Sequence, residues 1–189
     1  MRYVYQKFIF VLALTVLGCS PQGPKNGVHK EYYSDKSLHY ISFYKNGKLN
    51  GVQKEFFKDG RSRAERGYKD GEYHGLTKIF HKNGQLRTMG FFVNGGRDNI
   101  MMVYFDNGQI EYDLFYKNNE LEGEGKQYHR NSNLLKIAHY INGAEDGEVK
   151  EFYESGALKE KRMVDKGMVC ERLRYDEKGN LIDEENMSP

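Results

Sequence analysis

The sequence predicts an all-β protein, an elongated single-layer antiparallel β-meander built from tandem 24-residue hairpin repeats. Aromatic residues recur every 24 positions in two columns between residues 32 and 166. Turn signals follow one another at alternating spacings of 13 and 11 residues, and no segment sustains the 3.6-residue period of a helix. A fixed period of this length indicates stacked units that share one continuous core. We therefore expect function to lie on a surface and not in a cleft.

The two aromatic columns are the strongest repeat signal. The first contains Tyr32, Phe56, Phe80, Tyr104, Tyr128 and Phe152. The second contains Tyr44, Tyr68, Phe92, Tyr116 and Tyr140, and it continues with Val164. We expect these rings to pack as ladders between neighbouring hairpins, beside a thin seam of one Leu or Ile per repeat. The turn glycines, beginning with Gly47 and Gly71, are expected to leave room for rings over the backbone.

The turn signals place two strands in each repeat. Most are Asn-Gly or Asp-Gly pairs, which favour hairpins because both residues tolerate a positive φ. Strands of about 6 residues then give about 12 strands in all. The last unit is one residue shorter, with its aromatic at Tyr175. The turn glycines are Gly47, Gly60, Gly71, Gly84, Gly95, Gly108, Gly143, Gly156, Gly167 and Gly179, with Asn119 and Ser132 at two further turns.

Residues 1–18 have the pattern of an export signal. Arg2 and Lys7 are followed by an apolar run that ends at Leu17. This run is too short to span a bilayer, because a spanning helix needs roughly 20 apolar residues. The stretch from Val16 to Cys19 resembles the lipobox of bacterial lipoproteins, in which the cysteine is acylated and becomes the new N-terminus. We therefore predict lipidation at Cys19. The alternative interpretation is an ordinary signal peptide in which Cys19 has no special role.

The mature chain divides into three further segments. Residues 19–29 contain two prolines and two glycines, a linker composition that predicts a flexible tether. Residues 30–183 form the predicted repeat domain, with five to six repeats and a partial one. Residues 184–189 form an acidic tail, and charge at this final edge is expected to discourage pairing with another chain. Because Ser20 is not the Asp that retains lipoproteins in the inner membrane, we expect the outer membrane if the cell has one.

Charge is balanced in sum but not in distribution. Without residues 1–18 the chain has 27 basic and 27 acidic residues, which does not support nucleic acid as a partner. Residues 19–100 carry 15 Lys and Arg against 8 Asp and Glu, a net charge of +7, and residues 101–189 carry 12 against 19, a net charge of −7. The basic half of the chain lies next to the predicted anchor.

The sequence lacks the patterns that would indicate an enzyme or a metal site. His81 and His129 share a column, but they are two repeats apart, and strand stacking would separate them by about 19 Å. We find no nucleophile elbow, phosphate loop or paired-acid motif, and we expect no catalytic residues, metal or cofactor. Cys170 lies in the strand-like run from Met168 to Tyr175 and is expected to be a structural thiol.

A column of lysines is the best candidate for a binding stripe. It contains Lys54, Lys78, Lys126 and Lys150, whose equivalents would lie about 10 Å apart along the sheet. This distance is close to the screening length of 0.1 M salt, roughly 10 Å. The alternative is that these side chains cover aromatic rings through cation–π contacts.

The repeat unit resembles a known family. The segments 51–60 with 67–75, and 147–160, are similar to the MORN-variant repeat of bacterial proteins: a Gly, then Lys-x-aromatic, a polar-Gly turn, a Leu, a second aromatic and a closing Gly. Met102, Asn99 and Ser62 depart from this pattern. The resemblance implies a curved single-layer meander. Proteins similar to this chain are often labelled YwqK-type antitoxins, partners of a secreted or contact-dependent toxin, and eukaryotic relatives are associated with membrane lipids and self-association.

These observations predict a lipid-anchored repeat scaffold that binds another protein, with a toxin domain as one possible partner. The alternative is a structural envelope protein that binds lipid headgroups or assembles on itself through its two oppositely charged halves. The sequence does not indicate which face of the sheet would be used.

Overall fold

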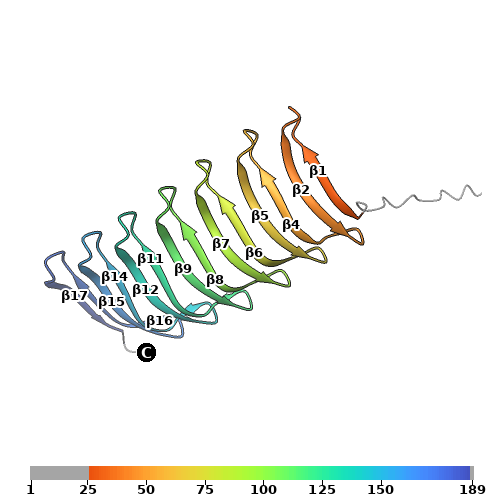
Figure 1. Cartoon of the computed structure of the whole chain (residues 1–189). Coiled ribbons are helices and arrows are strands. Elements are labelled where there is room, and N and C mark those ends of the chain that lie inside the picture. Colours follow the sequence, from red (N-terminus) through yellow and green to blue (C-terminus); the bar gives the residue numbers. More distant parts are fainter. Residues whose placement is uncertain (1–25, 188–189) are drawn as a thin grey trace, which may run out of the picture.

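The computed structural model describes residues 26–187, which form one open antiparallel sheet of 17 strands without helices. The strands follow one another across the sheet in chain order, and the sheet is elongated, with the first and last strands at opposite ends (Figure 1). The strands are β1 (Gly27–Tyr32), β2 (Leu38–Lys45), β3 (Lys48–Leu49), β4 (Gly51–Phe56), β5 (Ser62–Lys69), β6 (Glu72–Phe80), β7 (Leu86–Val93), β8 (Gly96–Tyr104), β9 (Ile110–Lys117), β10 (Glu120–Leu121), β11 (Gly123–Tyr128), β12 (Leu134–Ile141), β13 (Ala144–Glu145), β14 (Gly147–Phe152), β15 (Leu158–Asp165), β16 (Met168–Tyr175) and β17 (Leu181–Asn186).

The predicted fold class is confirmed, with a different strand count. The sequence predicts about 12 strands, whereas the described chain has 17, of which β3, β10 and β13 have two residues each. Each of these short strands is separated by one residue from the longer strand that follows it. The split arises because a bulge interrupts the ladder there, as shown by the pairing of Tyr140 with Glu145 and of Ile137 with Lys150.

Two kinds of turn alternate along the chain and lie on opposite long edges of the sheet (Figure 1). The first kind has two central residues with positive φ, such as Asn46 at 51° and Gly47 at 73°, which is the geometry of a type I′ hairpin. The second kind is longer and has one residue with positive φ, such as Gly60, whose N–H donates to the carbonyl of Phe57 at 2.9 Å. Asn119 and Ser132 have φ values of 72° and 70°, so they replace glycine as predicted.

Turns of the first kind also connect one repeat to the next. The Gly71 N–H donates to the carbonyl of Leu49 at 2.8 Å, and the Gly143 N–H donates to that of Leu121 at 2.9 Å. Gly95, Asn119 and Gly167 make equivalent bonds. Each turn therefore satisfies a backbone group of the preceding unit, and the units cannot be shifted relative to one another without breaking these bonds.

The one-residue deletion in the last unit falls in the bulge. In the β12 unit the pairing register shifts by two residues between Ile137 and Tyr140. Between β15 and β16 it shifts by one, since Met163 pairs with Glu171 and Val164 with Val169. The deletion therefore shortens the bulge and leaves the hairpin after it, which includes Tyr175, in its usual arrangement.

Alternation along the strands gives the sheet two different faces. We call the side that carries Ser42, Glu55, Ala64, Thr77 and Val149 the core face, because these residues are at most 6% exposed. We call the opposite side the lysine face, because it carries the lysine column. The buried apolar residues of the core face are small, namely Ala64, Ala138, Val149 and Val164, and half-buried Tyr140 and Val169 pack against the last three of them. A single layer thus builds its core from small side chains covered by larger neighbours.

The predicted aromatic ladders are only partly formed. Alternation places the first aromatic column on the lysine face and the second on the core face, at opposite ends of the strands. Equivalent rings of successive units lie two strand spacings apart, with one strand between them. This distance of about 9.6 Å is too long for direct contact between rings. An intervening side chain must connect them: Tyr73 lies between Tyr68 and Phe92, with ring centroids 4.8 and 5.4 Å away. In the next unit Arg97 takes that place and lies 5.4 Å from the ring of Tyr116.

The prediction that turn glycines make room for aromatic rings is wrong. A Cβ added at Gly47 would meet no atom within 4 Å, and at Gly71 it would meet only the side chain of Lys48 at 3.8 Å. These glycines are required by their positive φ. The glycine that a ring covers is Gly125 on the core face, where an added Cβ would lie 2.8 Å from Cε2 of Tyr140.

The sheet extends beyond both predicted ends of the repeat domain. β1 begins at Gly27, so residues 27–29 of the predicted tether belong to the sheet. β17 continues to Asn186, so residues 184–186 of the predicted tail are also a strand. The reason is that β1 pairs with β2, and β17 with β16, beyond the residues that the repeat pattern in the sequence covers. Residues 1–18 and Cys19 lie outside the described residues.

Replacing Gly125 by Ala tests the close packing of the core face. The new methyl group would collide with Tyr140 and would lie 3.1 Å from Cδ2 of Leu114, so the free energy of unfolding should fall by about 1–3 kcal/mol. Gly96→Ala is the matched control, since its nearest side-chain atom, Cβ of Asn119, is at 3.6 Å. Urea unfolding of both variants measures the effect. Equal stability of the two would contradict the packing described here.

Candidate functional site

The structure places the four predicted lysines in one line on the lysine face. Lys54 pairs with Ile41, Lys78 with Met89, Lys126 with Asp113 and Lys150 with Ile137 across neighbouring strands. Met102 occupies the equivalent position of the intervening unit. The line is therefore continuous along the sheet but has a gap in its charge between Lys78 and Lys126.

Ion pairs reduce the charge of this line toward the C-terminal end. Lys126 binds Glu124 at 2.6 Å, and Lys150 binds Glu148, which Lys161 also contacts at 2.9 Å. Lys54 lies farther from its partner, at 3.7 Å from Glu65. The cation–π contacts found among residues 26–187 involve other cations, such as Arg130 over the ring of Phe105. Ion pairs therefore account for the contacts of these lysines better than cation–π contacts with aromatic rings do.

An apolar stripe runs beside the lysines on the same face. We define the apolar stripe as Phe43, Val52, Phe91, Ile100 and Phe115, each of which is between 39% and 45% exposed. Phe91 pairs with Leu76 and Ile100 pairs with Phe115, so apolar side chains face one another across the strands of both the third and the fourth unit. Val52 lies two residues from Lys54 on the same strand. Sequence reasoning missed this stripe because Gly67 and His139 interrupt its 24-residue column.

The core face carries a buried ion network at its N-terminal end. The carboxylate of Glu55, 3% exposed, accepts hydrogen bonds from Tyr40 Oη at 3.1 Å and Arg63 Nη1 at 2.9 Å. Arg66 Nη1 lies 2.7 Å from its other oxygen. Burial raises the pKa of Glu55, but the hydrogen bonds and charges of these neighbours outweigh burial and hold the pKa below its usual value. Glu55 is therefore an ionised structural residue and not a proton donor.

A second network occupies the equivalent positions four repeats later. Arg162 binds Glu145 at 2.9 Å, Glu151 at 2.9 Å and Glu160 at 2.8 Å. Lys136 also binds Glu145. Burial opposes ionisation of Arg162, but hydrogen bonds to the three carboxylates raise its pKa. In the middle units the positions equivalent to Glu55 and Arg66 hold uncharged residues, such as Val103 and Leu114.

The histidines of one column have a structural role at the longer turns. His81 Nε2 lies 2.8 Å from the carbonyl oxygen of Tyr104, and His129 Nε2 lies 3.0 Å from that of Phe152. Tyr33 and Tyr153 donate hydrogen bonds to the equivalent carbonyls. The contact joins each turn to the next repeat, and within the described residues no group of three His, Cys, Asp or Glu side chains could hold a metal ion.

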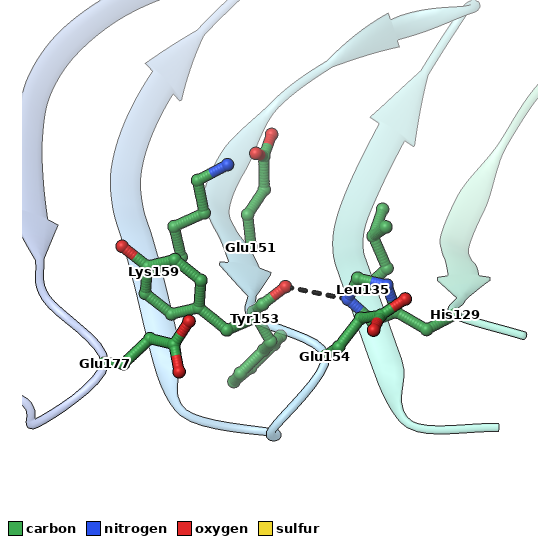
Figure 2. A pocket seen from close by; sticks show the side chains of 8 residues that line it. His129, Leu135, Glu151, Tyr153, Glu154, Lys159 and Glu177 are labelled. Atoms are coloured by element: carbon green, nitrogen blue, oxygen red, sulfur yellow. Dashed lines mark hydrogen bonds between the residues drawn. The ribbon is translucent and has the colours of Figure 1, made fainter. Parts of the chain in front are cut away.

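One open hollow lies at the longer turns of the C-terminal units (Figure 2). It has a volume of about 360 Å³ and is lined in part by His129, Glu151, Tyr153, Lys159 and Glu177. The histidine ring points at the carbonyl of Phe152, and Lys159 lies 5.8 Å from the ring centroid of Tyr153. His129 thus joins two repeats, whereas Lys159 and Tyr153 flank a single turn, so the hollow is a gap between neighbouring turns.

The predicted strand from Met168 to Tyr175 is confirmed as β16, and it contains Cys170. The cysteine is half-buried and free, with its Sγ 3.6 Å from the carbonyl oxygen of Met168. In the described part of the chain there is no helix long and apolar enough to cross a membrane.

Together these features define an open repeat protein whose units build two continuous faces, one holding the units together and one exposed. The family model of the MORN repeat variant matches residues 25–48, 73–94, 97–118, 121–142 and 145–165. These matches cover more than half of the chain, and the chain belongs to this family. Residues 49–72 form the same hairpin unit in the structure, with Ser62 where the other units have Leu or Ile. The comparison with curated proteins gave no match. MORN repeats generally bind proteins or membranes and are generally not enzymes.

The Glu55 network can be tested by removing one partner. Arg66→Met leaves the buried carboxylate without its shortest contact, so the free energy of unfolding should fall by about 3 kcal/mol. The double variant Arg66→Met with Glu55→Gln also removes the charge and should regain most of this loss. Chemical denaturation at neutral pH compares the two, and equal losses would show that the charge is not what the arginine compensates.

Proposed function

We propose that this protein is a lipid-anchored scaffold of the cell envelope that binds another protein through its lysine face. The apolar stripe is the observation that carries this proposal. Three phenylalanines and two aliphatic residues lie exposed on a regular sheet, and exposed apolar patches bordered by polar residues mark interaction sites. Aromatic side chains, phenylalanine among them, are enriched in protein–protein interfaces relative to the rest of the surface.

The surroundings of the stripe indicate the chemistry of the partner. Lys54 and Lys78 border it, and residues 19–100, which contain all of the stripe except Phe115, carry a net charge of +7. A complementary partner would present an apolar patch with an acidic rim, because such charges steer association and exclude wrong partners. The resemblance to antitoxin-labelled repeat proteins makes a toxin domain the first partner class to test.

The proposed anchor keeps this surface close to a membrane. Acylation at Cys19 would leave seven residues before the first strand at Gly27. Two or more acyl chains, at about 0.8 kcal/mol per buried CH₂, hold a protein firmly at a bilayer. The exposed face would then stay within the reach of this short tether from the membrane, on the periplasmic side of an outer membrane if the cell has one.

Lipidation has a direct chemical test. The wild-type protein should incorporate radiolabelled palmitate and fractionate with membranes, whereas Cys19→Ala should do neither, because the acylated thiol is missing. Cys170→Ala is the matched control and should label like the wild type. Equal labelling of wild type and Cys19→Ala would refute the anchor.

The binding face can be tested by removing its aromatic anchors. The double variant Phe91→Ser with Phe115→Ser should fold normally, since both side chains are exposed, and should lose at least tenfold in partner recovery from envelope extract. Ile182→Ser, which also removes an exposed apolar side chain, is the control and should retain the partner.

The toxin hypothesis needs one further result from the same experiment. The recovered partner, expressed alone, should arrest growth, and coexpression of the wild-type repeat protein, but not of the double variant, should relieve the arrest. Recovery that is the same for wild type, double variant and control would contradict binding through the stripe.

A further inference from the structure

The sheet ends in two strands that each have an open edge. In the described chain β1 pairs with β2 alone and β17 pairs with β16 alone. Both end strands expose apolar side chains: Val28 and Tyr32 are 56% and 57% exposed on β1, and Leu181 is 50% exposed on β17. An open strand edge is a template for pairing with another chain.

The two end strands are of complementary kinds. Every repeat has a leading strand that begins at the Leu position, such as β12, and a trailing strand that ends at the first aromatic column, such as β14. Leading and trailing strands alternate along the whole sheet. β1 ends at Tyr32 and is a trailing strand, whereas β17 begins at Leu181 and is a leading strand. Each end therefore lacks the kind of strand that the other end presents.

We propose that the β1 edge of one copy pairs with the β17 edge of another, so that copies join head to tail and the repeat continues across the joint. The internal junctions define the register. Lys136 pairs with Glu151 and Ile137 with Lys150 between β12 and β14. The equivalent residues at the joint are Asp183 and Glu184 on β17, and Glu31 and Lys30 on β1. Glu184 thus faces Lys30, and Asp183 faces Glu31.

Charge favours this joint over the other two pairings of ends. Glu184 with Lys30 repeats the cross-strand pairing of Glu65 with Lys78 inside the sheet. The like charges of Asp183 and Glu31 oppose it, but Asp183 already forms an ion pair with Arg174 in its own copy. The acidic β17 edge repels a second β17 edge, and the net charges of +7 and −7 on the two halves attract opposite ends.

A joint of this kind is heterologous, so it adds copies head to tail into arrays or rings and does not stop at a dimer. It uses strand edges, whereas the proposed partner binds the lysine face. Loss of partner binding in the stripe variant would therefore leave assembly intact, and loss of assembly would leave partner binding intact.

Charge reversal at the joint tests the proposal with the full-length protein in a mild detergent. Sedimentation velocity over a concentration series should show wild-type species larger than dimers at low salt and fewer of them at high salt. Lys30→Glu and Glu184→Lys should each weaken association about tenfold, since like charges would face one another. Both residues are exposed, so the fold should persist.

The mixture of the two variants is the decisive measurement. In an equimolar mixture of Lys30→Glu and Glu184→Lys, every joint between one variant and the other carries opposite charges, so mixing should restore large species in which the two alternate. The double variant should also restore them. Glu177→Lys makes the same charge change in the exposed last turn, away from the edge, and should assemble like the wild type. A monomeric wild type at low salt, unaffected single variants or a mixture that stays dissociated would each overturn the proposal.

Discussion

Backbone pairing between one hairpin and the next is the interaction on which this protein depends. A single-layer sheet has no second layer to pack against, so each unit is stabilised almost entirely by its two neighbours. The shorter turns make this pairing specific, because their first central residue and glycine take positive φ values and the turn N–H reaches the carbonyl of the preceding unit. The glycine pattern in the sequence is therefore a pattern of backbone geometry and not of side-chain packing.

The two faces of the sheet are under different structural constraints. On the core face, neighbouring side chains must fit over one another within one layer, which favours small residues such as Ala64 and Ala138 and covering residues such as Tyr140. Most of the charged side chains there lie in ion-pair networks at either end, around Glu55 and Arg162. The lysine face has no such constraint along its middle, and it can expose the apolar stripe without loss of unit-to-unit packing.

The sequence could predict what depends on local conformation or on strict period. Turn positions, the number of repeats, the hairpin order and the line of lysines follow from residues that recur every 24 positions. It could not predict the bulges, because bulges of the same length recur in successive units and leave the 24-residue period intact. The sequence also did not reveal the apolar stripe or the Arg162 network. The residue type at these positions differs from unit to unit, and the side chains come together only when the strands lie side by side.

The sequence by itself therefore determined an open meander of MORN-variant hairpins, because the turn residues and the alternation of strands are encoded locally in every unit. Only the tertiary structure decided which columns share a face, since cross-strand register assigns the two aromatic columns to opposite sides and separates equivalent rings by an intervening strand. It also decided that the ends of the sheet are complementary, because this depends on which kind of strand is left unpaired at each end.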